Sequence, residues 1–132
     1  MRFLEESFVL GALARGRAVE QFLGPAGDAE IRGVRWVEVV PNHAGFGVVL
    51  HTSADVGSEQ FCDLVEFPPL ALGDEEFGRE IAEVRAAVDA LAIAEARTGA
   101  VRDRWVNGGI ARDEYRDFVR AGRPDHWPAD AT

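Results

Sequence analysis

Three short apolar runs and the apolar stripe that follows them constrain the fold of this chain most strongly. The runs, at residues 34–40, 46–51 and 61–67, are rich in the β-branched and aromatic residues that favour strands. After Asp74, apolar residues recur at alternating spacings of four and three, as on one face of a helix. The members of this stripe are Phe77, Ile81, Val84, Val88 and Leu91. Strand-like runs followed by a helical stripe predict an α+β fold. We expect a three- to four-stranded antiparallel meander over residues 30–68, with a long amphipathic helix packed on one face.

Helices are also expected before and after these elements. Residues 7–23 carry dense apolar side chains and predict an N-terminal helix ending at Gly24, or two short helices if the chain breaks near Gly16. Residues 111–121 predict a short C-terminal helix. Its expected buried side chains are Tyr115, Phe118 and Val119.

Turn signals divide the chain between these elements. Residues 41–45 have the length and composition of a hairpin connection, whereas residues 52–60 form a longer polar loop of the kind that often carries function. We expect the long helix to break near Gly99, although a similar apolar spacing continues to Trp105. Residues 1–132 are expected to form a single domain, because no linker or repeat divides them.

Composition indicates a cytoplasmic globular protein. Apolar residues make up 47% of the chain and charged residues 28%, as in ordinary folded domains. The single cysteine cannot form an internal disulfide, and we recognise neither a secretory signal nor a membrane span. All 14 basic residues are arginine, a usage typical of GC-rich bacterial genomes.

Acidity is concentrated in the middle of the chain. The formal net charge is −9, and residues 34–98 hold twelve acidic residues against four arginines. This charge disfavours nucleic-acid binding and favours a basic protein partner, while solubility alone is the simpler explanation. The residues we predict to contact a partner are Glu76, Glu80, Glu83, Asp55 and Trp127.

Catalytic and metal-binding patterns are weak. Cys62, His51 and Asp55 could in principle form a nucleophilic set, but a lone cysteine in an apolar strand is usually a buried hydrophobe. The three histidines lack the spacing of a metal site, so we expect no metal and no cofactor.

We therefore expect binding rather than catalysis. The preferred interpretation is a small acidic protein-interaction module of bacterial type, such as an antagonist, adaptor or regulatory subunit. The alternative is a small-molecule-binding or hydrolytic domain that uses the sheet and the 52–60 loop. Its pocket candidates are Trp36, His51 and Cys62. The oligomeric state stays open, with a homodimer among the alternatives.

Overall fold

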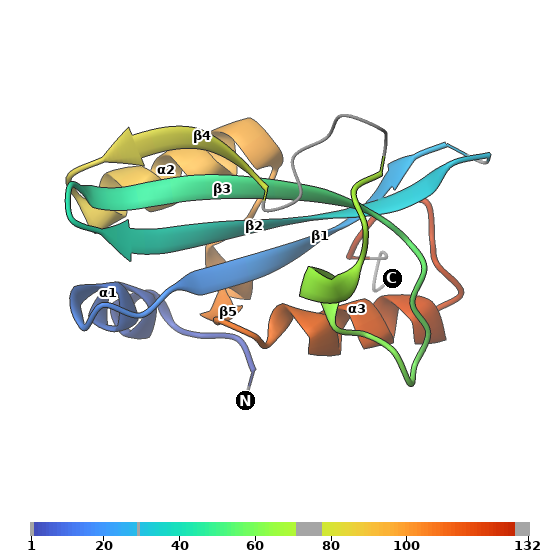
Figure 1. Cartoon of the computed structure of the whole chain (residues 1–132). Coiled ribbons are helices and arrows are strands. Elements are labelled where there is room, and N and C mark those ends of the chain that lie inside the picture. The colour runs from blue at the N-terminus through green and yellow to red at the C-terminus, as the bar shows by residue number, and fades with distance from the viewer. Residues whose placement is uncertain (1, 29, 71–77, 129–132) are drawn as a thin grey trace.

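The protein is built on a five-stranded antiparallel sheet in the order β4-β3-β2-β1-β5 (Figure 1). The computed structural model describes residues 2–28, 30–70 and 78–128. The predicted α+β class is confirmed, although the sheet has more strands than the three or four expected. The strands are β1 (Val19–Gly27), β2 (Arg32–Asn42), β3 (Gly45–Ala54), β4 (Arg79–Val84) and β5 (Val106–Asn107).

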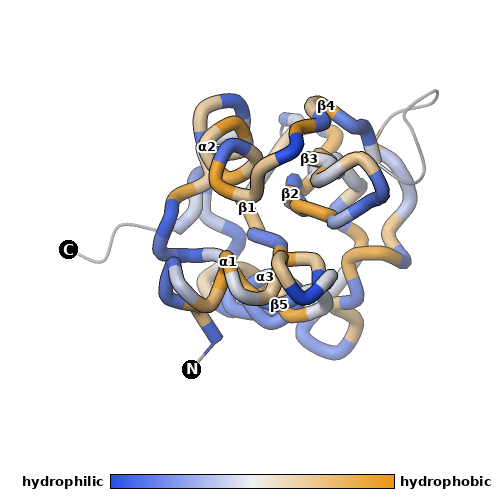
Figure 2. The backbone as a smooth tube through the Cα atoms, turned by 90° about the vertical axis from the view of Figure 1, so that its left-hand side faces the viewer, coloured by the Kyte–Doolittle hydropathy of each residue, from blue (hydrophilic) through white to orange (hydrophobic). Residues whose placement is uncertain are grey.

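Helices cover both faces of the sheet. α2 lies along β3 and β4 on one face, and α3 packs beneath β1 on the other (Figure 1); we call these the α2 face and the α3 face. In the turned view of Figure 2, β1 and β2 lie between α2 above and α3 below. No helix in the described ranges is long and apolar enough to cross a bilayer. The helical elements are α1 (Glu6–Ala14), η1 (Leu64–Glu66), α2 (Ala87–Thr98), η2 (Arg102–Arg104) and α3 (Ala111–Arg120).

Each face of the sheet has its own hydrophobic core. On the α2 face, Val37, Val39 and Val48 pack with residues of α1 and α2. On the α3 face, Phe22 and Trp36 pack with residues of α3 and the segment around η1. Successive residues of a strand point to opposite faces, so β2 contributes to both cores. Burial on both sides explains why this strand has an almost continuous apolar sequence.

The hairpin predicted at residues 41–45 is confirmed. Asn42 pairs with Gly45, and the Oδ1 atom of Asn42 accepts a hydrogen bond from the backbone N–H of Ala44 at 2.9 Å. Gly45 has a φ of 134°, and a Cβ there would lie 2.3 Å from the carbonyl oxygen of Val84. Only glycine fits this close approach, which lets the start of β3 pass close to the end of β4.

The N-terminal helix is shorter than predicted, because the second half of residues 7–23 forms a strand. α1 ends at Ala14, and Gly16 follows with a φ of 81°. The chain then enters β1, which pairs with β2 on one side and β5 on the other. The helical prediction was wrong here because pairing with residues distant in sequence outweighs local pattern.

The third predicted strand, at residues 61–67, is also wrong. The segment crosses the α3 face through η1 instead of joining the sheet, and it buries Cys62, Leu64 and Phe67. These side chains are two and three positions apart, which suits a turn of helix laid on a hydrophobic surface rather than strict alternation. The apolar content was recognised, but its periodicity was misread.

The long helix predicted from residue 74 is replaced by a strand and a shorter helix. Asp74 and Phe77 lie outside the described residues. Ile81 and Val84 belong to β4, where an irregularity opposite Val48 and Val49 shifts the register. The remaining members of the predicted stripe differ in burial, since Leu91 is fully buried on α2 and Val88 is 50% exposed.

The end of α2 and the C-terminal helix agree with the sequence. Gly99 terminates α2 in a left-handed conformation, with a φ of 82°. α3 buries Tyr115 and Phe118, and Val119 packs at the margin of the same core. Trp127 folds back onto this core against Phe118.

Candidate functional site

The strand register places three carboxylates in one row across the α3 face. Glu20 on β1 lies directly opposite Glu38 on β2. Glu38 in turn lies opposite Val49 on β3, and Val49 lies opposite Glu80 on β4. We call Glu20, Glu38 and Glu80 the acidic row. Like charges directly opposite each other on neighbouring strands are destabilising, so the fold alone does not favour the pair of Glu20 and Glu38, whereas Val49 separates Glu80 from Glu38.

Glu20 is the buried end of the acidic row. Its residue is 6% exposed, and its Oε2 atom accepts a hydrogen bond from the backbone N–H of Ala111, the first residue of α3, at 3.0 Å. Burial raises the pKa of Glu20, against the lowering effect of backbone hydrogen bonds from Gly109 and Ala111. The charge of Glu38 raises this pKa further. Glu20 is therefore a fixed carboxylate that is costly to ionise.

The side chain of Glu38 is held by His51, its diagonal neighbour on β3. The Nε2 atom of His51 lies 2.5 Å from the Oε1 atom of Glu38, and the Trp36 ring stacks on the His51 ring with centroids 3.8 Å apart. Trp36 is 3% exposed, and within the described residues its Nε1 donor has no hydrogen-bond partner. Two predicted pocket residues, Trp36 and His51, thus lie together beside the acidic row.

A hollow of about 270 Å³ opens at the Glu20 end of the row. The sheet, the segment around η1 and the connection from β5 to α3 form its walls. Arg112, which is exposed, supplies the positive charge in the lining. The lining residues are Glu20, Trp36, Glu38, Asp63, Leu64, Val65, Gly108, Gly109 and Arg112. We call this hollow the row pocket.

The exposed end of the row lies on β4. Glu80 and Glu83 are both exposed, and Glu83 accepts a hydrogen bond from the Nδ2 atom of Asn42 at 3.2 Å. A Cβ on Gly47 would lie 3.0 Å from the Oε2 atom of Glu80, so Glu80 leans over that glycine. Two of the predicted partner contacts, Glu80 and Glu83, thus share the α3 face, whereas Glu76 lies outside the described residues.

Asp55 is engaged inside the protein. The Tyr115 hydroxyl donates a hydrogen bond to Oδ1 at 2.5 Å, and the Nε atom of Arg123 donates to Oδ2 at 2.9 Å. Burial and the hydrogen bond to Asp55 raise the pKa of Tyr115. Arg123 also donates to the carbonyl oxygen of Gly57 at 2.7 Å. Asp55 therefore ties the 52–60 loop to α3 and to the chain after it.

The side chain of Trp127 likewise contacts other residues of the protein. Its Nε1 atom donates to the Oε2 atom of Glu114 at 2.5 Å, and its ring packs edge-on against Phe22 and Phe118. Glu114 is fully buried and pairs with Arg104 at 2.6 Å. Trp127 thus closes the core of the α3 face.

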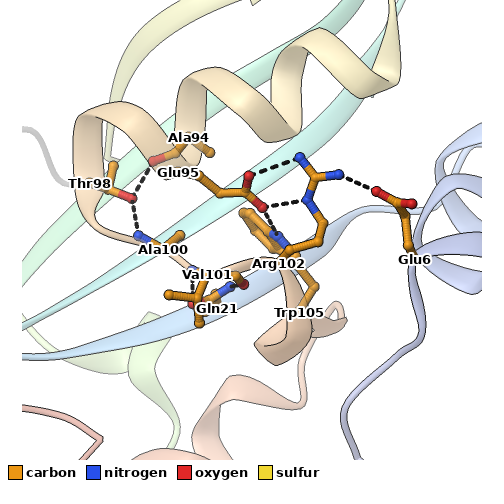
Figure 3. A network of polar contacts seen from close by, with 9 residues as sticks. All are labelled: Glu6, Gln21, Ala94, Glu95, Thr98, Ala100, Val101, Arg102 and Trp105. Atoms are coloured by element: carbon orange, nitrogen blue, oxygen red, sulfur yellow. Dashed lines mark hydrogen bonds and ion pairs between the residues drawn. The ribbon is translucent and has the colours of Figure 1, made fainter.

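A separate polar network joins the helices on the α2 face. Arg102 lies between Glu95 and Glu6 and pairs with both, which connects α2 to α1 (Figure 3). The Nε1 atom of Trp105 also donates to Glu95 at 3.3 Å. On the opposite side of the network, the Gln21 side chain bonds the backbone of Val101. These carboxylates are neutralised by an arginine, unlike those of the acidic row.

The residues of the weighed nucleophilic set do not meet. His51 contacts Glu38, Asp55 contacts Tyr115 and Arg123, and Cys62 accepts a hydrogen bond from the Nη2 atom of Arg116 at 3.1 Å. Among the described residues, no group of three or more histidine, cysteine, aspartate or glutamate side chains is arranged to hold a metal ion.

No family model, curated protein or solved structure matches this chain.

Sequence reasoning missed Glu20, the buried end of the acidic row. Glu20 was assigned to a helix, where it has no relation to Glu38. Alternation in the segment from Val19 to Phe22 was the available signal, since Val19 and Gln21 share one face of the strand while Glu20 and Phe22 share the other. Gly16 immediately before this segment pointed to a change of element.

Proposed function

We propose that the protein is a non-catalytic interaction module that binds a positively charged segment of another protein over the acidic row. The observation that carries this proposal is the cross-strand alignment of Glu20, Glu38 and Glu80 on one face of the sheet. Neighbouring carboxylates repel each other in the free protein, and a cationic partner would relieve that repulsion. An antagonist, an adaptor or a regulatory subunit could each work in this way.

The face of the sheet suits a partner better than its free edge does. β4 is an edge strand, and it carries Arg79, Glu80 and Glu83 together with an irregular register. The Nη1 atom of Arg97 donates to the carbonyl oxygen of Ile81 at 2.6 Å, which occupies one backbone acceptor of this strand. Charges and irregularities on an edge discourage strand addition. A partner is therefore expected to lie across the α3 face rather than extend the sheet.

We also propose where the protein works in the cell. The formal net charge of −9 disfavours a phosphate backbone as partner, and Cys62 is a buried free thiol. Together with the arginine usage, these features support a bacterial, cytoplasmic protein.

A titration with a basic peptide tests the proposal. A lysine- and arginine-rich dodecapeptide should bind the wild-type protein, and its affinity should fall as salt screens the charges. The double variant Glu38→Gln, Glu80→Gln should bind more weakly than wild type. The double variant Glu30→Gln, Asp103→Asn is the matched control, because it also removes two carboxylates, both exposed and outside the acidic row. Equal losses in the acidic-row variant and the control would refute the acidic row as the binding surface.

A small cationic metabolite is the second candidate, favoured by the presence of Trp36 and three carboxylates, Glu20, Glu38 and Asp63, in one hollow. The volume of about 270 Å³ lies just under the range of roughly 300–1,000 Å³ usual for ligand pockets. Binding of small amines with an affinity that exceeds that of basic peptides would favour this candidate over the first.

A further inference from the structure

We infer that the row pocket receives one arginine side chain of the protein partner, with Glu20 and Glu38 as its acceptors and Trp36 as its wall. This inference rests on the proposed function, since it names the anchor of the same acidic surface. It goes further by choosing arginine over lysine and by assigning a specific role to the buried end of the row.

The two carboxylates suit a guanidinium group. Glu20 and Glu38 are direct cross-strand neighbours, a relationship that places Cβ atoms about 4.5–5.5 Å apart. Both are oriented before a partner arrives, Glu20 by the N–H of Ala111 and Glu38 by His51. A guanidinium is planar and presents five donors in a fixed fork, so it can bond two fixed carboxylates at once. An ammonium group is a compact and more strongly hydrated charge, and it gains less from this geometry.

Trp36 provides the observation that points to a peptide. It lines the row pocket and is 3% exposed, yet its Nε1 donor has no partner among the described residues. A buried donor without an acceptor is costly, and a cation cannot supply that acceptor. A peptide that inserts an arginine also brings backbone carbonyl groups, and one of them can accept from this N–H only when binding uncovers the Nε1 atom, which is buried in the free protein.

The rim of the pocket fits the rest of an arginine side chain. Val65 is 69% exposed and lies in the pocket lining, where the aliphatic stem of an arginine can cover it. Asp63 adds a third carboxylate to the lining, and Arg112 is the opposing cation. Because Arg112 is exposed, solvent weakens its repulsion, but its removal should still strengthen binding.

Two matched peptides test the inference. Both are capped nonapeptides with lysines on the flanks and the same net charge, and they differ only in a central arginine or lysine. The arginine peptide should bind wild type about tenfold more tightly. Glu20→Gln should abolish this difference, whereas Glu80→Gln should weaken both peptides equally. Arg112→Gln should strengthen binding of the arginine peptide, and this variant keeps the test valid if Glu20→Gln does not fold.

The indole N–H of Trp36 gives a second, independent readout. Its resonance, assigned by its loss in Trp36→Phe, should shift when the arginine peptide is added. Because both peptides carry the same backbone carbonyl groups, the lysine peptide should shift it only at the higher concentrations that its weaker binding requires. Equal binding of the two peptides by wild type would overturn the arginine pocket while leaving the proposed function intact. Failure of both peptides to bind at low salt would overturn the proposed function as well.

Discussion

Glu20 and Glu38 lie directly opposite each other on neighbouring antiparallel strands, and both side chains point to the α3 face. Glu20 is buried beneath the start of α3, while Glu38 is half-buried and held by His51. The two carboxylates therefore differ in environment although they share one position in the sheet. This difference leads to a prediction about pH and stability.

The substitution Glu20→Gln should change the free energy of unfolding more favourably near neutral pH than in acid. Because the pKa of Glu20 is raised in the folded state, the unfolded chain releases this proton at a lower pH than the folded chain does. The free energy of unfolding of wild type therefore falls as pH rises from the usual glutamate pKa toward the raised one. The glutamine variant lacks this loss, which includes the repulsion between the Glu20 and Glu38 charges.

Urea unfolding of wild type and Glu20→Gln over a pH series measures this effect. The free energy of unfolding of the variant minus that of wild type should increase between about pH 4 and pH 7. A difference that stays constant, or falls, over this range would contradict a raised pKa.

Leu91→Ala and Val88→Ala should have very different effects on stability. Leu91 is fully buried in the core of the α2 face, so its truncation should cost about 2–5 kcal/mol. Val88 is 50% exposed on the same helix and should change stability by no more than about 0.5 kcal/mol. Denaturant midpoints of the two variants provide the measurement. Similar losses would restore the continuous apolar stripe predicted from the sequence.

Tyr115→Phe should destabilise the protein by about 1–3 kcal/mol, because it leaves the buried Asp55 carboxylate with one partner fewer. A double-mutant cycle with Asp55→Asn isolates the interaction between the two side chains. The coupling energy should lie between about 0.5 and 3 kcal/mol. Additive effects of the two substitutions would show that the hydroxyl contributes nothing through Asp55.

The thiol of Cys62 should react slowly in the folded protein. Its residue is 7% exposed and packs in the core of the α3 face. Labelling with a thiol reagent should be slow in buffer and fast in concentrated urea, since access requires opening of this core. Labelling of the native protein as fast as that of a small free thiol would place Cys62 on an accessible surface.

Local signals in the sequence predicted the elements that depend on few distant contacts. The β2–β3 hairpin follows from its turn residues and from alternating strands, and Gly99 ends α2 by its own conformation. For the segment from Ile81 to Leu91, the same local signals led to a wrong prediction. An irregular strand followed by a short helix reproduces helical spacing over these positions, and only pairing with β3 distinguishes the two cases.

The candidate site was only partly predictable for the same reason. Trp36 and His51 are cross-strand neighbours within one hairpin, so a sequence that predicts the hairpin also predicts that these two side chains lie close together. Glu20 reaches that part only because β1 pairs with β2. Trp127 looked exposed in a polar tail, but Glu114 and the aromatic core bring it inward.

β5 is the edge strand next to β1. It pairs Val106 with Glu20, two residues that are far apart in the sequence. Contacts between such distant positions carry a loop-closure entropy cost, which only the assembled fold offsets. The row pocket has walls from β1, β2, η1 and the start of α3, so it exists only when these segments are packed together. A ligand of the pocket would therefore bind the folded chain and not the unfolded one. Added ligand should consequently raise the global unfolding temperature and slow hydrogen exchange throughout the sheet.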